Sequence, residues 1–135
     1  MPSSTGQDAA KGRVAVVDDE PEIGDIIRRA LRRRYDVDVY ETASEAYAAL
    51  DDGKRYDVIM CDLLMPDVSG RDVFEHLADK WPDQAQRIVF MSGVSREGAR
   101  DEILADIDAP MIEKPFRLGD LRRTVRHIAA AHDSE

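Results

Sequence analysis

Four short apolar runs in this sequence each lead into a side chain that can take part in chemistry. These side chains are Asp18 with Asp19, then Asp62, Ser92 and Lys114. Clustered carboxylates attract a hard cation such as Mg²⁺, a lysine ammonium neutralises anionic oxygens, and a serine hydroxyl donates hydrogen bonds. Phosphoryl transfer needs these parts, because metal, cation and hydroxyl donors hold the equatorial oxygens of the transferred group.

Asp62 is the candidate nucleophile of such a reaction. It follows the apolar residues 58–61, and a loop containing Pro66 and Gly70 comes next. A carboxylate attacks readily only a phosphoryl donor with a good leaving group, such as a phosphorylated imidazole, and the attack needs no general base. Considered alone, Asp62 fits equally well as an aspartate that caps the following loop through its own backbone.

The elements that would position these residues follow from the apolar pattern. Successive residues of a strand point to opposite faces of the sheet. A run in which both the odd and the even positions are apolar is therefore typical of a parallel strand covered on both faces. We expect strands at residues 13–17, 36–40, 56–61, 87–91 and 109–113, and helices at 21–31, 42–50, 69–81, 95–107 and 118–131. Capping boxes are expected at Thr42 with Glu45 and at Ser69 with Asp72, and Pro82 is expected to end the third helix.

This alternation predicts an α/β fold, a doubly wound five-stranded parallel sheet with five helices and right-handed crossovers. The carboxyl ends of parallel strands meet at one edge of the sheet, so the candidate residues would become neighbours there. Three carboxylates at that edge would repel one another unless one is protonated or a cation neutralises them.

Composition limits the class of partner and the compartment. The 135 residues carry a formal net charge of -9 and suit one domain. A strongly acidic chain argues against nucleic acid or an anionic membrane as the main partner. The single cysteine, Cys61, excludes an intrachain disulfide. Neither a membrane span nor a secretory signal is visible, so a cytoplasmic location is expected.

The basic residues nevertheless gather in two places. Arginines are dense at residues 28–34 and again at residues 122–126, each time on a predicted amphipathic helix. This pattern favours two solvated outer helix faces. The alternative is a docking patch for an acidic partner.

Four motifs occur in order along the chain: Val-Val-Asp-Asp-Glu-Pro at 16–21, Asp62 with Met-Pro-Asp at 65–67 and Gly70, Met-Ser-Gly at 91–93, and Glu-Lys-Pro-Phe at 113–116. Each motif is weak alone, but their order and spacing make a strong signal. From about residue 13 to residue 131 the chain resembles the receiver domain of two-component response regulators. The resemblance implies the flavodoxin-like sheet order 2-1-3-4-5.

The resemblance implies that Asp62 is the phosphoacceptor, and that the phosphoryl group comes from a histidine kinase or a histidine phosphotransfer protein. It implies that Mg²⁺ binds directly to Asp19, Asp62 and the backbone carbonyl of Leu64, and to Asp18 through water. Ser92 and Lys114 would hold the phosphoryl oxygens, and the bond before Pro115 would be cis. Such a domain is a signalling phosphoacceptor rather than an enzyme, assisting only its own phosphorylation and slow dephosphorylation.

Two positions depart from the family pattern. Met111 stands three residues before Lys114, where receivers commonly place an aromatic switch residue, and a thioether offers neither ring nor hydroxyl. Leu64 is apolar where the side chain borders the phosphoryl site, and it would shield the site from water or simply pack in the loop. A phosphorylation-independent interaction module is therefore the alternative function. A phosphatase with an aspartyl nucleophile fits less well, because no acid stands two positions after Asp62.

The expected domain organisation is a flexible tail at residues 1–12, the receiver domain at 13–132 and a short tail at 133–135. We expect a single-domain receiver or one excised from a longer protein. The resemblance implies an output surface for a downstream protein or for a homodimer on the fourth helix, fifth strand and fifth helix, about residues 95–131.

Overall fold

The computed structural model describes residues 11–93 and 104–133 of the chain. The strands are β1 (Gly12–Val17), β2 (Tyr35–Tyr40), β3 (Val58–Asp62), β4 (Ile88–Gly93) and β5 (Met111–Lys114). The helices in the described part are α2 (Pro21–Leu31), α3 (Ala43–Asp51), α4 (Gly70–Lys80), α5 (Pro82–Ala85) and α7 (Leu118–Asp133).

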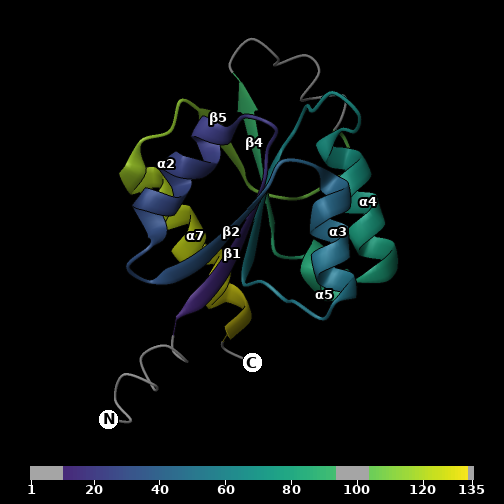
Figure 1. The fold of residues 1–135 in the computed structure, drawn as a ribbon, viewed down its shortest axis with the longest axis horizontal. Helices are drawn as coiled ribbons and strands as arrows, with labels where there is room; N and C mark the ends of the chain where they lie inside the picture. Colours follow the sequence, from purple (N-terminus) through teal and green to yellow (C-terminus); the bar gives the residue numbers. More distant parts are fainter. Residues whose placement is uncertain (1–10, 94–103, 134–135) are drawn as a thin grey trace.

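All strands pair in parallel, in the order β2-β1-β3-β4-β5, which confirms the predicted topology. Helices α2 and α7 cover one face of the sheet, and α3, α4 and α5 cover the other (Figure 1). The central strand β3 is covered on both faces and is buried along its whole length. This explains why the strand reads as an unbroken apolar run.

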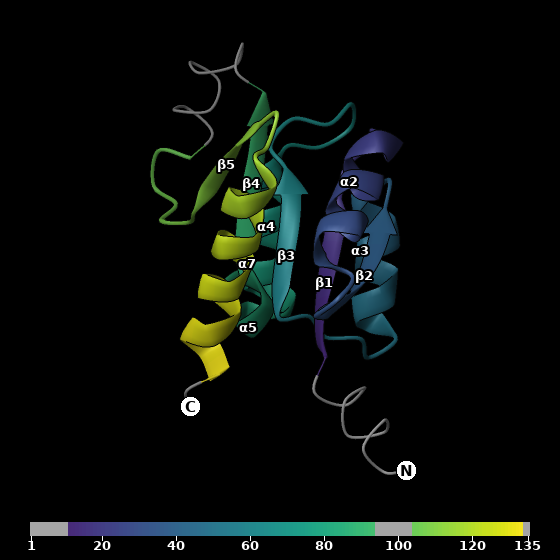
Figure 2. The same ribbon diagram turned by 90° about the vertical axis from the view of Figure 1, so that its left-hand side faces the viewer.

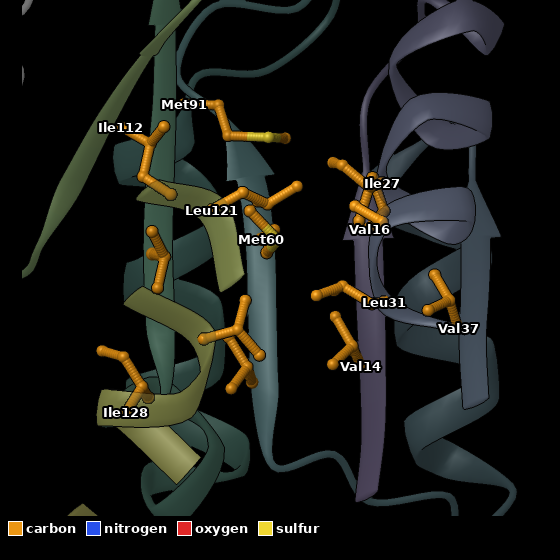
Figure 3. Close-up of a cluster of buried hydrophobic side chains, with 14 of the residues drawn as sticks. Val14, Val16, Ile27, Leu31, Val37, Met60, Met91, Ile112, Leu121 and Ile128 are labelled. Carbon is orange, nitrogen blue, oxygen red and sulfur yellow. The ribbon is translucent and has the colours of Figure 1, made fainter. Parts of the chain in front are cut away.

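Two hydrophobic clusters hold the layers together, one on each face. The cluster between the sheet and the pair α2 and α7 is shown in Figure 3, where Ile27 and Leu31 of α2 and Leu121 of α7 point toward Val16 and Met60 of the strands. The opposite cluster takes the alternate strand residues together with residues of α3, α4 and α5, and includes Ala15, Ile59, Cys61, Ala46, Leu50 and Leu77. Because alternate side chains of a strand point to opposite faces of the sheet, each apolar run contributes residues to both hydrophobic clusters.

The capping box predicted at Ser69 is confirmed, whereas only half of the one predicted at Thr42 forms, because the Glu45 carboxylate accepts a hydrogen bond from the Glu41 N–H at 3.0 Å instead of from the Thr42 N–H. The Thr42 side chain accepts a hydrogen bond from the backbone N–H of Glu45 at 3.2 Å. Ser69 and Asp72 form a complete capping box, with bonds of 3.2 Å and 3.0 Å. Each cap satisfies backbone N–H groups that the first helical turn leaves without partners.

The structure differs from the prediction near Pro82. Helix α4 ends at Lys80, and Pro82 begins the short helix α5 instead of only ending α4. Proline is favoured at a first helical position because its missing N–H is not needed there. The buried side chain of Gln84 in α5 then bonds both backbone groups of Tyr56, at 2.9 Å and 3.1 Å. This helix therefore anchors the segment that enters β3.

The first strand and the last helix are slightly longer than predicted. Strand β1 begins at Gly12 and helix α7 extends to Asp133. The helix predicted at residues 95–107 falls largely outside the described residues, and residues 104–106 form a turn. Within residues 11–93 and 104–133, no helix combines the length and the apolar character that crossing a bilayer requires.

Candidate functional site

A pocket of about 420 Å³ opens at the carboxyl edge of the sheet. Figure 2 shows the arrowheads of β3 and β4 at the same end of the molecule. We call this the acidic pocket; its lining residues are Asp19, Glu20, Asp62, Leu63, Leu64, Ser92, Gly93 and Lys114. Strands β1, β3, β4 and β5 each contribute at their carboxyl ends or in the loop that follows, as the topology requires.

Lys114 is the centre of the charge cluster. Its Nζ lies 2.9 Å from Asp18 Oδ2, 3.1 Å from Glu20 Oε1 and 3.4 Å from Asp62 Oδ1. The Lys114–Pro115 peptide bond is cis, as the resemblance implied. Three carboxylates from two strand ends therefore share one ammonium group, and the cluster keeps a net negative charge.

Asp18 is completely buried at the base of this cluster. Its Oδ1 accepts a hydrogen bond from the backbone N–H of Glu20 at 2.9 Å. Its Oδ2 is within ion-pair distance of Lys114, but this buried oxygen forms no hydrogen bond with the described residues. A buried carboxylate oxygen without a donor is suited to a cation or to a water held by one.

The carboxylates that meet are not the set that the sequence indicated. Asp18, Glu20 and Asp62 each offer an oxygen, and these atoms lie within 4.8 Å of one another. Asp19 lines the acidic pocket but is not a member of this group. Glu20 was missed, although the signal was present, since it ends the acidic run directly after β1.

Burial and mutual repulsion set the charge states of these groups. Burial, together with the negative charge of Asp18, raises the pKa of Asp62 to about 6, although Lys114 opposes the rise. Burial also raises the pKa of Asp18 above its ordinary value. Burial alone would lower the pKa of Lys114, but the neighbouring carboxylates outweigh it and raise the pKa. The cation is firmly charged, and without a metal the Asp62 carboxylate is close to taking up a proton at neutral pH.

Ser92 completes the acidic pocket from β4. It is buried, and its Oγ donates a hydrogen bond to the carbonyl of Gly93 at 3.2 Å. Ser92 pairs with Glu113 and Gly93 with Lys114 in the sheet register, so the hydroxyl and the ammonium come from neighbouring strands. The structure thus brings Ser92 and Lys114 to the same pocket as Asp62.

Met111 lies away from the acidic pocket, at the first position of β5. It pairs with Phe90 in the sheet and packs, half-buried, against the hydrophobic cluster shared with α3 and α4. Its contacts are those of a core residue.

The loop that follows Asp62 is closed by its own backbone. The Gly70 N–H donates to the Leu63 carbonyl at 2.6 Å, and the Met65 N–H donates to the Val68 carbonyl at 3.1 Å. Leu64 and Ser69 form an antiparallel bridge between these two bonds. A Cβ at Gly70 would lie 2.9 Å from the Phe90 ring, so glycine allows this close approach.

A doubly wound sheet with acids after β1, an aspartate ending β3, a hydroxyl in β4 and a lysine ending β5 defines a phosphoacceptor domain. The chain matches the response regulator receiver domain family over residues 14–126, and it belongs to that family. Receiver domains accept a phosphoryl group in two-component signalling, take it from histidine kinases, and bind Mg²⁺ in an acidic pocket.

Two relatives illustrate the range of proteins that contain this domain. The chain is 31% identical to the hydrogenase transcriptional regulatory protein HoxA of Bradyrhizobium diazoefficiens, a match that covers 86% of this chain and 24% of HoxA. It is 23% identical to the response regulator receiver protein CpdR of Brucella abortus, covering 88% of this chain and 98% of CpdR. The chain therefore spans only a quarter or less of several curated relatives that it matches.

Solved structures support the fold. A response regulator receiver domain protein from Clostridium thermocellum matches with a TM-score of 0.78 at 19% identity, covering 90% of this chain and 97% of that chain. At this level of identity the similarity concerns the arrangement of helices and strands.

Proposed function

We propose that Asp62 is the residue on which this receiver domain accepts its phosphoryl group. The observation that carries the proposal is the convergence of Lys114 on Asp18, Glu20 and Asp62 at the carboxyl edge of the sheet. Asp62 is the carboxylate of this group that ends the central strand, and it faces the acidic pocket beside Ser92.

The proposed reaction is a direct displacement. An Asp62 oxygen attacks the phosphorus of a phosphohistidine on a histidine kinase or a histidine phosphotransfer protein. The new P–O bond forms as the P–N bond breaks, and the electron pair leaves with the imidazole nitrogen. Ser92 and Lys114 bind the phosphoryl oxygens on either side of the acceptor.

The donor set fits Mg²⁺, because carboxylates surround a buried oxygen that lacks a hydrogen-bond donor. Bound Mg²⁺ supplies the positive charge that neutralises the phosphoryl oxygens and the carboxylates. Asp19, Asp62 and the Leu64 backbone carbonyl are the proposed direct ligands, with Asp18 acting through water. The Glu20 carboxylate forms an ion pair with Lys114 Nζ at 3.1 Å. Because Glu20 is exposed, its side chain can move aside when a phosphoryl oxygen binds Lys114 in its stead.

We assign this activity to residues 13–132 and infer that its output is contact with a downstream protein. The proposed output surface, by resemblance, includes β5 and α7, and it would serve either that protein or a second copy of the domain. The net charge of -9 supports a protein partner rather than nucleic acid.

The test is intact mass after incubation with Mg²⁺ and phosphoramidate, for the native chain, Asp62→Asn and Asp67→Asn. Asp67 is an exposed acid in the same loop, so its variant controls for the loss of one charge. We expect one added phosphoryl group on the native chain and on Asp67→Asn, and none on Asp62→Asn or in the presence of a chelator. Equal labelling of all three folded proteins would overturn the assignment of Asp62.

A second candidate function, a phosphorylation-independent interaction module, is favoured by Met111. Its contacts with the core provide no ring or hydroxyl that could report phosphorylation from the usual switch position. Amide NMR spectra with and without phosphoramidate separate the two functions. Shifts along β4 and β5 on phosphorylation support the signalling receiver, whereas shifts confined to residues adjoining Asp62 support the interaction module.

A further inference from the structure

A second hollow, of about 670 Å³, lies at the other end of the sheet from the acidic pocket. It is bounded by the C-terminal end of α2, the first residue of β2 and one side of α7. Because β2 starts here, the hollow lies at the amino edge of the parallel sheet. We call it the arginine hollow after the side chains that line it: Arg29, Arg32, Arg33, Arg34, Arg122 and Arg126.

The two arginine clusters of the sequence therefore meet in space. Helices α2 and α7 pack side by side on the same face of the sheet (Figures 1 and 2). The Arg122 Nε donates a hydrogen bond to the Ala30 carbonyl at 3.0 Å, which joins α7 to the last turn of α2. The positive charges come from segments about 90 residues apart but surround one concavity.

These charges are not balanced within the part of the chain that the structure describes. No carboxylate is among the described residues that line the arginine hollow. The nearby acids are used elsewhere, since Asp36 pairs with Lys11 at 3.5 Å and Asp120 pairs with Arg123 at 2.8 Å. Apart from Arg122, the lining guanidinium groups make no ion pair or side-chain hydrogen bond with residues 11–93 or 104–133.

Helix electrostatics explain only part of this arrangement. Arg29 is in the last turn of α2 and Arg32 is its C-cap, where cations complement the helix dipole. Arg122 and Arg126 lie in the interior of α7, more than one turn from its C-terminal end, so the dipole of that helix does not account for them. Like charges gathered around one hollow repel one another, and a bound anion would neutralise them.

We propose that the arginine hollow binds a small anion that carries two or more phosphoryl groups. Guanidinium groups bind phosphoryl oxygens in pairs of parallel hydrogen bonds, and arginine is the only charged residue type that lines the hollow in the described chain. The volume is within the range of small-ligand sites. The site is separate from Asp62 and does not depend on the function proposed there.

Charge and shape favour a compact ligand over an extended one. The chain as a whole carries -9, so a long polyanion would extend beyond the arginine hollow over an acidic surface. An acidic peptide offers one carboxylate per side chain, spread along its backbone. A phosphoryl group concentrates up to two negative charges and three acceptor oxygens in one position, which satisfies more guanidinium groups within the same space.

The test is calorimetric titration of the whole chain with inorganic tripolyphosphate. A chelator is included, because the acidic pocket repels anions when it has no cation. The double variant Arg33→Gln with Arg126→Gln removes two lining charges from different elements. The matched control is Arg117→Gln with Arg123→Gln, which removes two exposed charges outside the hollow.

We expect tripolyphosphate to bind the native chain and the control variant with similar affinity, and the Arg33 and Arg126 variant at least tenfold more weakly. Orthophosphate should bind more weakly than tripolyphosphate. Absence of binding, equal loss in both double variants, or tighter binding of a tetraglutamate peptide than of tripolyphosphate would each overturn the proposal. The last outcome would assign the hollow to an acidic protein instead.

Discussion

The acidic pocket and the arginine hollow hold opposite charges in opposite environments. In the acidic pocket, the carboxylates of Asp18 and Asp62 are buried and share the ammonium of Lys114. In the arginine hollow, the guanidinium groups are exposed and water screens them. Charge in the first region should therefore be coupled to the stability of the fold, and charge in the second mainly to ligand binding. Substitutions in the two regions test this contrast.

The largest effect is expected from Lys114→Met. Removing the ammonium leaves Asp18 buried without a counter-charge, and loss of one partner of a buried pair typically costs about 3 kcal/mol or more. We expect the free energy of unfolding at pH 7 to fall by about 3 kcal/mol in the presence of a chelator, measured by urea denaturation. Phosphorylation by phosphoramidate should also be lost.

The matched control is Lys80→Met. Lys80 pairs with Asp51 at 3.2 Å, and both side chains are exposed. An exposed pair contributes about 1 kcal/mol or less. Equal destabilisation by the two substitutions would contradict the claim that burial gives the acidic pocket its influence on stability.

Mg²⁺ should stabilise the native chain through the acidic pocket. At a free concentration a hundredfold above its Kd, a ligand of the folded state adds about 2.7 kcal/mol. We expect a rise in Tm on addition of Mg²⁺ that a chelator reverses. Asp62→Asn should reduce this rise strongly, whereas the Arg33 and Arg126 variant should keep it. An equal rise in Asp62→Asn would argue that the ion binds elsewhere.

Asp62→Asn should itself stabilise the metal-free protein. The pKa of Asp62 rises from 3.8 to about 6 on folding, so the folded chain retains a proton that the unfolded chain releases between these pH values. The ionised side chain therefore destabilises the fold above pH 6. The variant should be more stable by up to about 3 kcal/mol at pH 7, since the pKa shifts by about two units and each unit corresponds to about 1.4 kcal/mol.

The pH dependence provides the check on this prediction. As the pH falls from 7 toward 4, Asp62 of the native protein takes up a proton. The difference in free energy of unfolding between the native chain and Asp62→Asn should therefore shrink toward zero. Urea denaturation in chelator at several pH values measures the difference. A variant that is less stable than the native chain at pH 7 would contradict the burial argument.

Glu20→Gln tests the occupancy of Lys114 within the acidic pocket. Glu20 competes with an incoming phosphoryl oxygen for the Lys114 ammonium, and it is more exposed than Asp18 or Asp62. We expect phosphorylation by phosphoramidate to become about threefold faster, which corresponds to the ~0.7 kcal/mol of an exposed ion pair. Slower labelling would indicate that Glu20 helps to hold the metal.

The smallest effect on stability is expected in the arginine hollow. Arg33→Gln with Arg126→Gln changes exposed side chains that have no partner in the described chain, so the free energy of unfolding should stay within ~0.5 kcal/mol of the native value. The same urea denaturation measures it. A loss of several kcal/mol would show that these arginines act in packing rather than in binding.

The sequence predicted the fold well because its local signals agree with one another. The apolar runs, Pro21, and the caps at Thr42 and Ser69 mark the element boundaries that the structure has. The sheet order and the cis bond before Pro115 followed from the resemblance. The prediction that Pro82 ends α4 is confirmed but incomplete, because a proline that ends one helix can begin another, and the buried contacts of Gln84 hold that second helix in place.

The charge clusters were harder to predict. Sequence spacing placed Asp18, Asp62 and Lys114 at one edge, but it could not show that Glu20 turns toward Lys114, since side-chain direction in a loop depends on its three-dimensional neighbours. For the two arginine segments, the sequence pattern favoured two solvated helix faces, with a docking patch for an acidic partner as the alternative. The two segments line one hollow only because α2 packs against α7, and a local sequence pattern does not show how two distant helices pack.

The closed loop between Leu63 and Gly70 has a consequence for the direction of signalling. Its backbone bonds and the contact of Gly70 with Phe90 leave the α4 side of the acceptor little freedom to rearrange. Ser92 and Lys114, in contrast, reach the acidic pocket through side chains that can reorient. Information about the state of Asp62 should therefore travel toward β4 and β5, with the Asp62 loop serving as the fixed reference against which those strands move.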